Sequence, residues 1–532
     1  MKKIVIFSIA IALITGCSKD YLSSLQNNPN APTTGVATPQ LILPATITGI
    51  TNIINDWGTY SSMAVWMGYW NGQPGYSAFT NVFNYVMTNT GPQSWDNYYG
   101  VLTNLNALVQ QSQSVANSNY RDMANVLETI CFKNLVDLYN NIPYSQALKG
   151  SGDFYPNYDN GSAIYDSLVA KLDVAIADMQ ANLSNSAVTT PSSEDVMFGG
   201  NMSNWIKFAN TLKLRLLVMQ SNVSAKASYI ASEISNTASI GYLTTDALVN
   251  PGYNSSKPGN IWAAFGTNPT GGLNVGTGEY GANQAAIDFY RKTQDSRLAY
   301  FYTPVTITPA SSSFYSVVLP PNFTASGSGH FAGNYCGTQA TVAGGSSDIG
   351  PGILKSPSQS AVMMTAAESY FLQAEATVLG WLPGGNAAAQ SLYVKGIEKS
   401  YEFLGVAGGG VAADAAADAY YNQGTSQGTS FVIFPTGVSA DSLRHTILQQ
   451  KWAALNSINI LEPYNDWRRT FNPAMNSGYP IVPVSNSATN THAHMPFRYL
   501  YPVTEQNSNG IAWAAAGGAT TDAFNDKIFW MK

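Results

Sequence analysis

The chain carries little charge for its size. Only 11% of its 532 residues are Asp, Glu, Lys or Arg, and the net charge is −6, whereas about 25% of an average soluble protein is charged. The sequence contains no basic run that could neutralise phosphates, which excludes a nucleic-acid partner. Asn, Ser, Thr, Gly and Tyr supply polarity instead. Amides, hydroxyls and phenols suit an uncharged, polyhydroxylated ligand.

Long hydrophobic runs and cysteines are also scarce. No stretch after the N-terminus reaches the roughly 18 apolar residues of a transmembrane helix, so we expect the body of the protein to lie outside the bilayer. The three cysteines are Cys17, Cys131 and Cys336. No Cys/His group has the spacing of a zinc site, and we expect no metal, no cofactor and no catalytic residue. Cys131 falls in a helical pattern and is expected as a buried thiol, while its pairing with Cys336 stays open.

The N-terminus has the features of a secretory signal that ends at a cysteine. A cationic start precedes the apolar run Ile4–Ile14, which is too short to cross a membrane, and Ile14-Thr15-Gly16-Cys17 ends on small residues. This ending resembles the lipobox of bacterial lipoproteins, whose cysteine receives a diacylglyceryl group. We therefore expect a signal peptide at residues 1–16, lipidation of Cys17, and a tether at residues 17–40.

The remaining residues, 41–532, show helical periodicity in pairs of segments. Apolar residues recur at spacings of three and four, as in amphipathic helices. The regions with this pattern are residues 93–140, 162–220, 361–404 and 441–457. Loop-rich stretches are expected near 250–357 and 405–437. The pattern predicts one mainly α-helical domain, a tetratricopeptide-like helical-repeat scaffold with a long, irregular, loop-rich face.

Aromatic residues are concentrated between Trp57 and Tyr85 and are interleaved with Asn and Gln. Aromatic planes pack against the apolar faces of sugar rings, and amides bond to sugar hydroxyls. The helical spacing of several of these aromatics predicts that roughly half of them are core. The predicted ligand contacts are Trp66, Trp70 and Tyr76, beside a turn, and Trp262 and Phe265, in a second loop.

Several motifs are spread between Cys17 and about residue 510. They are Asn27-Asn28-Pro29-Asn30, Leu135–Ala147, Asn204–Asn210, Met364–Ala376, Gln450–Trp452, Asn465–Arg469 and Arg498–Pro502. Together they resemble the SusD/RagB family of outer-membrane nutrient-binding lipoproteins, in its SusD-like branch. The resemblance implies a non-enzymatic protein, held on the membrane by its lipid anchor alone, that binds an oligosaccharide and passes it to a SusC-like TonB-dependent transporter.

Two alternatives stay open. Some relatives bind peptides, so a peptide ligand is the first alternative. The second is a surface glycoside hydrolase, because two catalytic carboxylates can come from anywhere in a chain and nothing in this sequence selects such a pair.

Several charges within the family motifs stand out in a charge-poor chain. Buried charges must be paired, so we predict that these residues form ion pairs that lock helices together. The residues are Glu368, Arg468, Arg469, Arg498 and Glu505.

Overall fold

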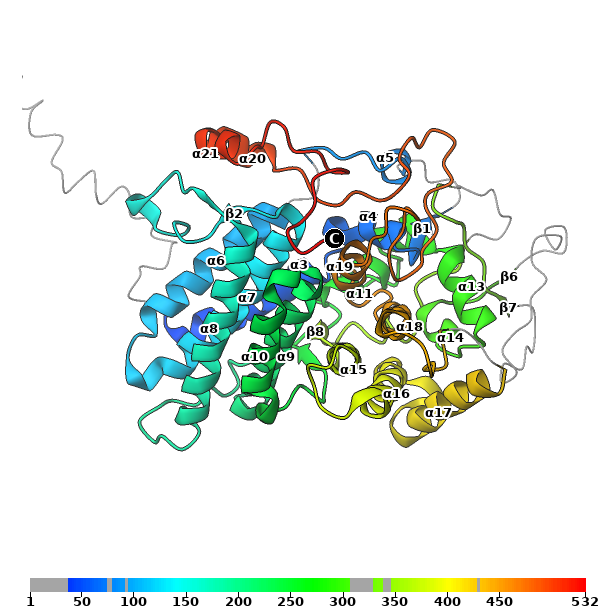
Figure 1. Ribbon diagram of the computed structural model, residues 1–532, viewed down its shortest axis with the longest axis horizontal. Helices are drawn as coiled ribbons and strands as arrows, with labels where there is room; N and C mark the ends of the chain where they lie inside the picture. Colours follow the sequence, from blue (N-terminus) through cyan, green and yellow to red (C-terminus); the bar gives the residue numbers. More distant parts are fainter. Residues whose placement is uncertain (1–36, 74–78, 91–93, 307–328, 338–345, 428–430) are drawn as a thin grey trace, which may run out of the picture.

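Helices supply most of the structure. The computed structural model describes residues 37–73, 79–90, 94–306, 329–337, 346–427 and 431–532 (Figure 1). Two predicted site residues, Cys17 and Tyr76, lie outside these ranges.

The bounds of the α-helices and strands follow in chain order. The helices are α3 (Pro39–Ile54), α4 (Trp57–Trp66), α5 (Thr80–Phe83), α6 (Ser94–Gln111), α7 (Ser118–Tyr139), α8 (Gly161–Asn182), α9 (Met202–Met219), α10 (Ala227–Thr237), α11 (Asn260–Phe265), α12 (Val275–Glu279), α13 (Gln284–Lys292), α14 (Leu298–Phe301), α15 (Ala366–Val378), α16 (Gly385–Leu404), α17 (Gly410–Gln427), α18 (Ala440–Ala454), α19 (Leu461–Arg469), α20 (Val503–Ser508) and α21 (Gly510–Ala515). The strands are β1 (Trp70–Gly72), β2 (Ile142–Pro143), β3 (Tyr158–Asp159), β4 (Ala247–Val249), β5 (Tyr280–Ala282), β6 (Val305–Thr306), β7 (Gly329–His330) and β8 (Ala361–Met364). They form the antiparallel pairs β1–β5, β2–β3, β4–β8 and β6–β7.

The long helices pack in sequential pairs. Helix α6 packs on α7, α7 on α8 and α8 on α9, and in the second half of the chain α15 packs on α16 and on α18. Figure 1 shows the first group on one side of the molecule and the second group on the other. Each pair buries the apolar stripes that the periodicity predicts. The predicted mainly helical, repeat-like scaffold is confirmed.

Two stretches differ from the prediction. Residues Ala361–Met364 form strand β8 rather than the start of a helix, and Thr365 then caps α15 by accepting a hydrogen bond from Glu368 N (3.2 Å). The Thr-x-x-Glu spacing marks this helix start, because it is the pattern of a capping box. The expected loop at 405–437 contains helix α17, which forms because its first half is rich in alanine, the strongest helix former.

Short strands and helix ends bring distant segments together on one side of α15. Strand β8 pairs with β4, with Val249 opposite Ala361, and the C-terminal end of α3 lies beside β8. Helix α16 ends at Leu404, and the following Gly405 has a positive φ of 74°, the left-handed conformation that favours glycine at this position. These ends surround the cavity described below.

Both described cysteines, Cys131 and Cys336, are buried and free, so they do not form a disulfide with each other. The buried thiol expected at Cys131 is confirmed. Across the ranges that the structure describes, every helix is too short or too polar to cross a membrane.

Candidate functional site

Three of the predicted aromatic contacts are core residues. Trp66, Trp70 and Phe265 are 3%, 1% and 2% exposed, and the rings of Trp70 and Phe265 lie 4.8 Å apart in an edge contact. Trp66 donates from its indole nitrogen to the carbonyl of Val82 (2.9 Å). The prediction that Trp70 and Phe265 contact a ligand is corrected, because burial of large apolar rings stabilises the core and removes them from solvent.

Trp262 differs from these core aromatics. It lies on α11, is half-buried, and donates from Nε1 to the carbonyl oxygen of Thr267 (3.1 Å). Its neighbour Ile261 lines the cavity described next. Trp262 therefore stays a proposed ligand contact.

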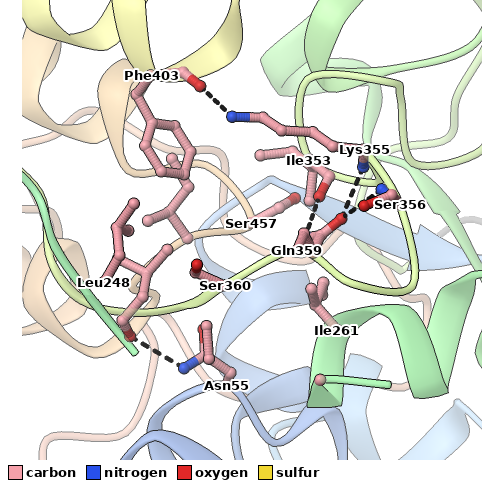
Figure 2. A pocket seen from close by; sticks show the side chains of 14 residues that line it. Asn55, Leu248, Ile261, Ile353, Lys355, Ser356, Gln359, Ser360, Phe403 and Ser457 are labelled. Carbon is pink, nitrogen blue, oxygen red and sulfur yellow. Dashed lines mark hydrogen bonds between the residues drawn. The ribbon is translucent and has the colours of Figure 1, made fainter. Parts of the chain in front are cut away.

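A cavity of about 330 Å³ opens where β8, the end of α3, α11 and the end of α16 meet; we call it the Lys355 cavity (Figure 2). Ligand pockets generally measure about 300–1,000 Å³ and combine apolar walls with a few polar groups. Here the lining residues are Asn55, Leu248, Gly259, Ile261, Ile353, Lys355, Ser356, Gln359, Ser360, Ala361, Val362, Phe403, Ser457 and Ile458. Among these described lining residues, only Lys355 has an ionisable side chain.

The loop that carries Lys355 is fixed by one amide side chain. Gln359 Oε1 accepts from the backbone N–H groups of Lys355 (2.7 Å) and Ser356 (3.1 Å), and its Nε2 donates to the carbonyl of Ile353 (2.8 Å). The loop is thereby closed on itself, as the dashed lines in Figure 2 show. A wall held in this way is formed before a ligand binds.

The opposite wall is held by Asn55 at the end of α3. Its Nδ2 donates both to Thr51 O within the helix (2.8 Å) and to Val362 O on β8 (3.0 Å). No hydrogen bond among the described residues uses Asn55 Oδ1, so this carbonyl can accept from a ligand.

The floor contains Ser457, which has a positive φ of 60°. Its hydroxyl accepts from Trp70 Nε1 (2.8 Å) and donates to Asn456 Oδ1 (3.0 Å). The buried Trp70 thus supports the cavity floor from behind. A non-glycine residue in this backbone region is held there by its surroundings, as is common around binding sites.

Lys355 lies at the mouth of the cavity. Its ammonium donates to the carbonyl oxygen of Phe403 at the end of α16 and lies 4.4 Å from the centre of the Phe403 ring. Burial lowers the pKa of the Lys355 ammonium, an effect that the negative charge of Asp246 opposes. No carboxylate of the described residues forms an ion pair with it.

A second, smaller hollow of about 150 Å³ lies beside Trp66. Its lining includes Asn81, Asn89, Tyr139 and Tyr499, so amides and phenols also surround this site. Trp66 reaches this hollow with only a small part of its ring, since the residue is 3% exposed. The hollow falls below the usual volume of a ligand pocket.

The predicted ion pairs are formed by two of the five charges. Glu368 pairs with Arg215, and Arg469 pairs with Glu375 (2.7 Å) and Asp466 (2.8 Å). These belong to a set that we call the buried charge network, which links α7, α9, α15, α18 and α19. Its members are Lys133, Asp137, Arg215, Glu368, Glu375, Arg444, Lys451, Glu462, Asp466 and Arg469.

The other three charges have neutral partners, which corrects the prediction. Arg468 donates to the carbonyls of Asp137 (2.6 Å) and Phe497 (2.8 Å), and Arg498 donates to the carbonyl of Tyr139. Glu505 accepts from Asn509 Nδ2 (2.8 Å), and burial raises its pKa. A guanidinium has five N–H donors, so backbone carbonyls can satisfy it without a carboxylate.

Sequence reasoning missed Lys355, Gln359, Phe403 and Asn55. One signal was present, since Lys355 is the only charge between Asp348 and Glu368. In a chain with so few charges, an isolated lysine in a loop was a candidate for a binding group. The other three residues carry no such signal, because amides and single aromatics are common throughout this chain.

The comparisons with known proteins agree with the architecture. Residues 29–502 match a SusD-like family model described as "Starch-binding associating with outer membrane". A solved chitin-binding protein is 23% identical, with a TM-score of 0.71 over 93% of this chain and 100% of its own. A chitin-binding SusD homologue from Flavobacterium johnsoniae is 20% identical, with a TM-score of 0.69 over 92% of this chain and 98% of its own.

A SusD/RagB family protein from Bacteroides thetaiotaomicron is 18% identical, with a TM-score of 0.69 over 93% of this chain and 98% of its own. No curated protein sequence matches the chain. At these identities the solved structures establish the fold alone, whereas the family model covers most of the sequence.

Proposed function

Because this chain belongs to the SusD-like family, we propose that it is a lipid-anchored nutrient-binding protein of the outer membrane that binds an oligosaccharide and passes it to a SusC-like transporter. The observation that carries the glycan assignment is the Lys355 cavity, whose polar groups are mainly hydroxyls and amides. Sugar hydroxyls pair with such groups, and the C–H faces of a sugar pack on apolar and aromatic walls.

The cavity contains the groups that binding needs. Asn55, Ser356 and Ser360 offer hydrogen-bonding atoms, while Ile261 and Phe403 offer apolar surface. At about 330 Å³ it is near the lower end of the usual range, which suits one or two sugar units rather than a long chain. The half-buried Trp262 is proposed as a contact for neighbouring units at the rim.

The non-enzymatic assignment rests on the lining. Glycoside hydrolysis requires two carboxyl groups on either side of the scissile bond. None of the described residues that line the cavity is an acid. A bound oligosaccharide is therefore expected to leave unchanged.

Binding is tested with two tryptophan substitutions on the same short helix. Ile261→Trp adds an indole inside the cavity, and Ala263→Trp, its matched control, adds the same group at an exposed position on α11. Against a panel of oligosaccharides and short peptides, we expect Ile261→Trp to weaken calorimetric binding at least about tenfold, since a filled pocket loses its contacts. Ala263→Trp should stay within about twofold.

Three results would overturn parts of this proposal. Absence of binding to any oligosaccharide would overturn the glycan assignment, and binding of peptides alone would replace it with the peptide alternative. Equal affinities of the two tryptophan variants would place the site elsewhere. Release of shorter sugars in the same samples would show an enzyme.

The membrane anchor is tested separately. Cys17→Ser removes the proposed lipid attachment site without changing the domain. Two or three acyl chains anchor a protein stably because each buried methylene contributes about 0.8 kcal/mol. We expect the full-length chain to sediment with membranes and the Cys17→Ser variant to be released from them.

A further inference from the structure

We infer that the Lys355 cavity recognises an acidic sugar, a uronic acid unit whose carboxylate pairs with the Lys355 ammonium. This inference rests on the proposed glycan-binding function and names the class of sugar. Its starting observation is that Lys355 is a cation that lines the cavity and forms no ion pair with a described carboxylate, since the charge of Asp246 acts on it only from beyond ion-pair distance.

Three other lysines of the described residues differ from Lys355 in this respect. Lys133, Lys213 and Lys226 each form an ion pair with a carboxylate at 2.5–2.7 Å. An ammonium has three N–H donors, and Lys355 uses one of them on a backbone carbonyl. The remaining donors can be satisfied by a ligand.

The ammonium is exposed and has protein contacts on one side. The Phe403 carbonyl and ring hold the Nζ atom at one side of the mouth, and the Gln359 bonds hold the backbone of Lys355 (Figure 2). A side chain that such contacts already order loses little conformational entropy when a ligand pairs with its charge. A hydrogen bond between charged groups is also about twice as strong as a neutral one.

The rest of the lining favours a sugar as the carrier of the carboxylate. The hydroxyls of Ser356 and Ser360 and the free Oδ1 of Asn55 can pair with ring hydroxyls, and Ile261 and Phe403 can pack on the ring. A phosphate would fit less well, because phosphate sites commonly add arginine forks or clustered backbone N–H groups to a lysine. Neither is among the described lining residues.

The overall charge of the protein strengthens the argument. The chain has a net charge of −6, so an anionic ligand is repelled on average and needs a local cation to be held. Lys355 is the only ionisable residue among the described lining residues, and it supplies that charge.

The structural role of Lys355 offers a competing explanation. A cation that donates to the last carbonyls of a helix also caps it, and Phe403 is next to the last residue of α16. The test therefore needs a readout that capping alone would not change. Ligand charge is such a readout, because a helix cap does not distinguish an acid from its ester.

The experiment compares each acidic oligosaccharide with its own methyl ester. Short oligomers of galacturonic, glucuronic and mannuronic acid, their methyl esters, and neutral gluco- and galacto-oligomers are titrated into the wild-type protein by calorimetry. We expect each acid that binds to bind about 10- to 100-fold more tightly than its ester. Its affinity should fall as salt is raised, while that of the ester should not.

Three variants assign this preference to one residue. Lys355→Met should bring the acid to the affinity of its ester, and Lys355→Arg should retain the preference, because it retains the charge. Lys292→Met, the matched control, removes an exposed lysine at the end of α13 and should change nothing. The melting temperature of each variant is recorded to show that it is folded.

The outcomes separate the inference from the proposed function. If neutral sugars bind and acids bind no better, or if Lys355→Met keeps the preference, the inference is overturned and the glycan-binding function stands. If no sugar binds, the proposed function fails. If short peptides bind only with a free C-terminal carboxylate and not as amides, the Lys355 ammonium binds a carboxylate, but the acidic-sugar assignment is overturned.

Discussion

In the buried charge network every cation contacts at least one carboxylate, whereas Lys355 at the cavity contacts a carbonyl and an aromatic ring. Both are cations in a chain with few charges. In the interior, a charge with neither a counter-charge nor hydrogen-bond partners would cost several kcal/mol, so every buried charge needs such partners. At the mouth of a cavity, solvent satisfies the ammonium until a ligand replaces it. The difference separates charges that hold the fold from a charge that is available for function.

The largest loss of stability is expected when Glu375 is replaced. This carboxylate accepts from both Arg469 (2.7 Å) and Arg444 (3.0 Å). Glu375→Gln would remove the carboxylate that these two buried guanidinium groups share, leaving Arg469 with Asp466 and Arg444 with the exposed Asp441. We expect it to lower the free energy of unfolding by about 3–5 kcal/mol. Urea unfolding measures this. The control Asp441→Asn removes an exposed partner of Arg444 and should cost less than about 1 kcal/mol.

A fall of less than about 1 kcal/mol in Glu375→Gln would contradict the view that the network holds the fold together. It would also remove the contrast on which the interpretation of Lys355 depends.

Lowering the pH should remove the stability that the carboxylates of the buried charge network contribute. Burial alone would raise the pKa of Glu375, but Arg469 and Arg444 outweigh it and lower the pKa to about 2. The pKa of Glu462 is likewise lowered to about 2, by Arg215 and Lys133 against the effect of burial. Because the folded pKa lies below the unfolded value, this stabilisation is present above about pH 4.5 and is lost as the pH falls toward 2.

The measurement is the urea midpoint of wild type and Glu375→Gln between pH 2 and pH 7. We expect the difference between the two proteins to shrink as the pH falls through this window. A difference that is constant with pH would show that ionised Glu375 does not contribute to stability.

Two tryptophans offer a similar contrast between a core residue and a residue near the cavity, with a smaller expected effect on stability. Trp70 is buried and bonds to Ser457 below the cavity, whereas Trp262 is half-buried on α11. Trp70→Phe removes a buried hydrogen-bond donor and some core volume, and should cost about 1–3 kcal/mol. Trp262→Phe should cost less than about 1 kcal/mol. Equal costs in urea unfolding would contradict the assignment of one to the core and the other to the rim.

The helical scaffold could be predicted because periodicity is a local signal. The spacing of apolar residues gave helices close to the observed bounds of α6 (Ser94–Gln111) and α8 (Gly161–Asn182). The helix at α17 was missed, since its glycines and amides favoured a loop while its alanines decided the outcome.

The cavity could not be predicted in the same way. Asn55, Leu248, Lys355 and Phe403 come from four distant segments, and only the pairing of β4 with β8 and the end of α16 bring them together. Similarly, the scarcity of charge indicated that Arg469 was buried and paired, but its partner Glu375 lies 94 positions away. The aromatic-rich segment also gave no indication of which rings face the core, because buried and ligand-binding aromatics have the same composition.

The smallest loss of stability is expected for Lys355→Met, and this variant tests most directly whether Lys355 differs from the charges of the buried charge network. Lys355→Met removes one positive charge, as a network variant would remove one negative charge, but it breaks no ion pair between side chains. Asp246 loses only a longer-range attraction. The direct contact that is lost is one cap on the C-terminus of α16, and interactions of this kind contribute about 0.3–1 kcal/mol. We therefore expect the unfolding free energy of Lys355→Met to fall by less than about 1 kcal/mol, several times less than that of Glu375→Gln. A fall comparable to that of Glu375→Gln would show that Lys355 belongs to the structural charges, and the argument for a charge held ready for a ligand would fail.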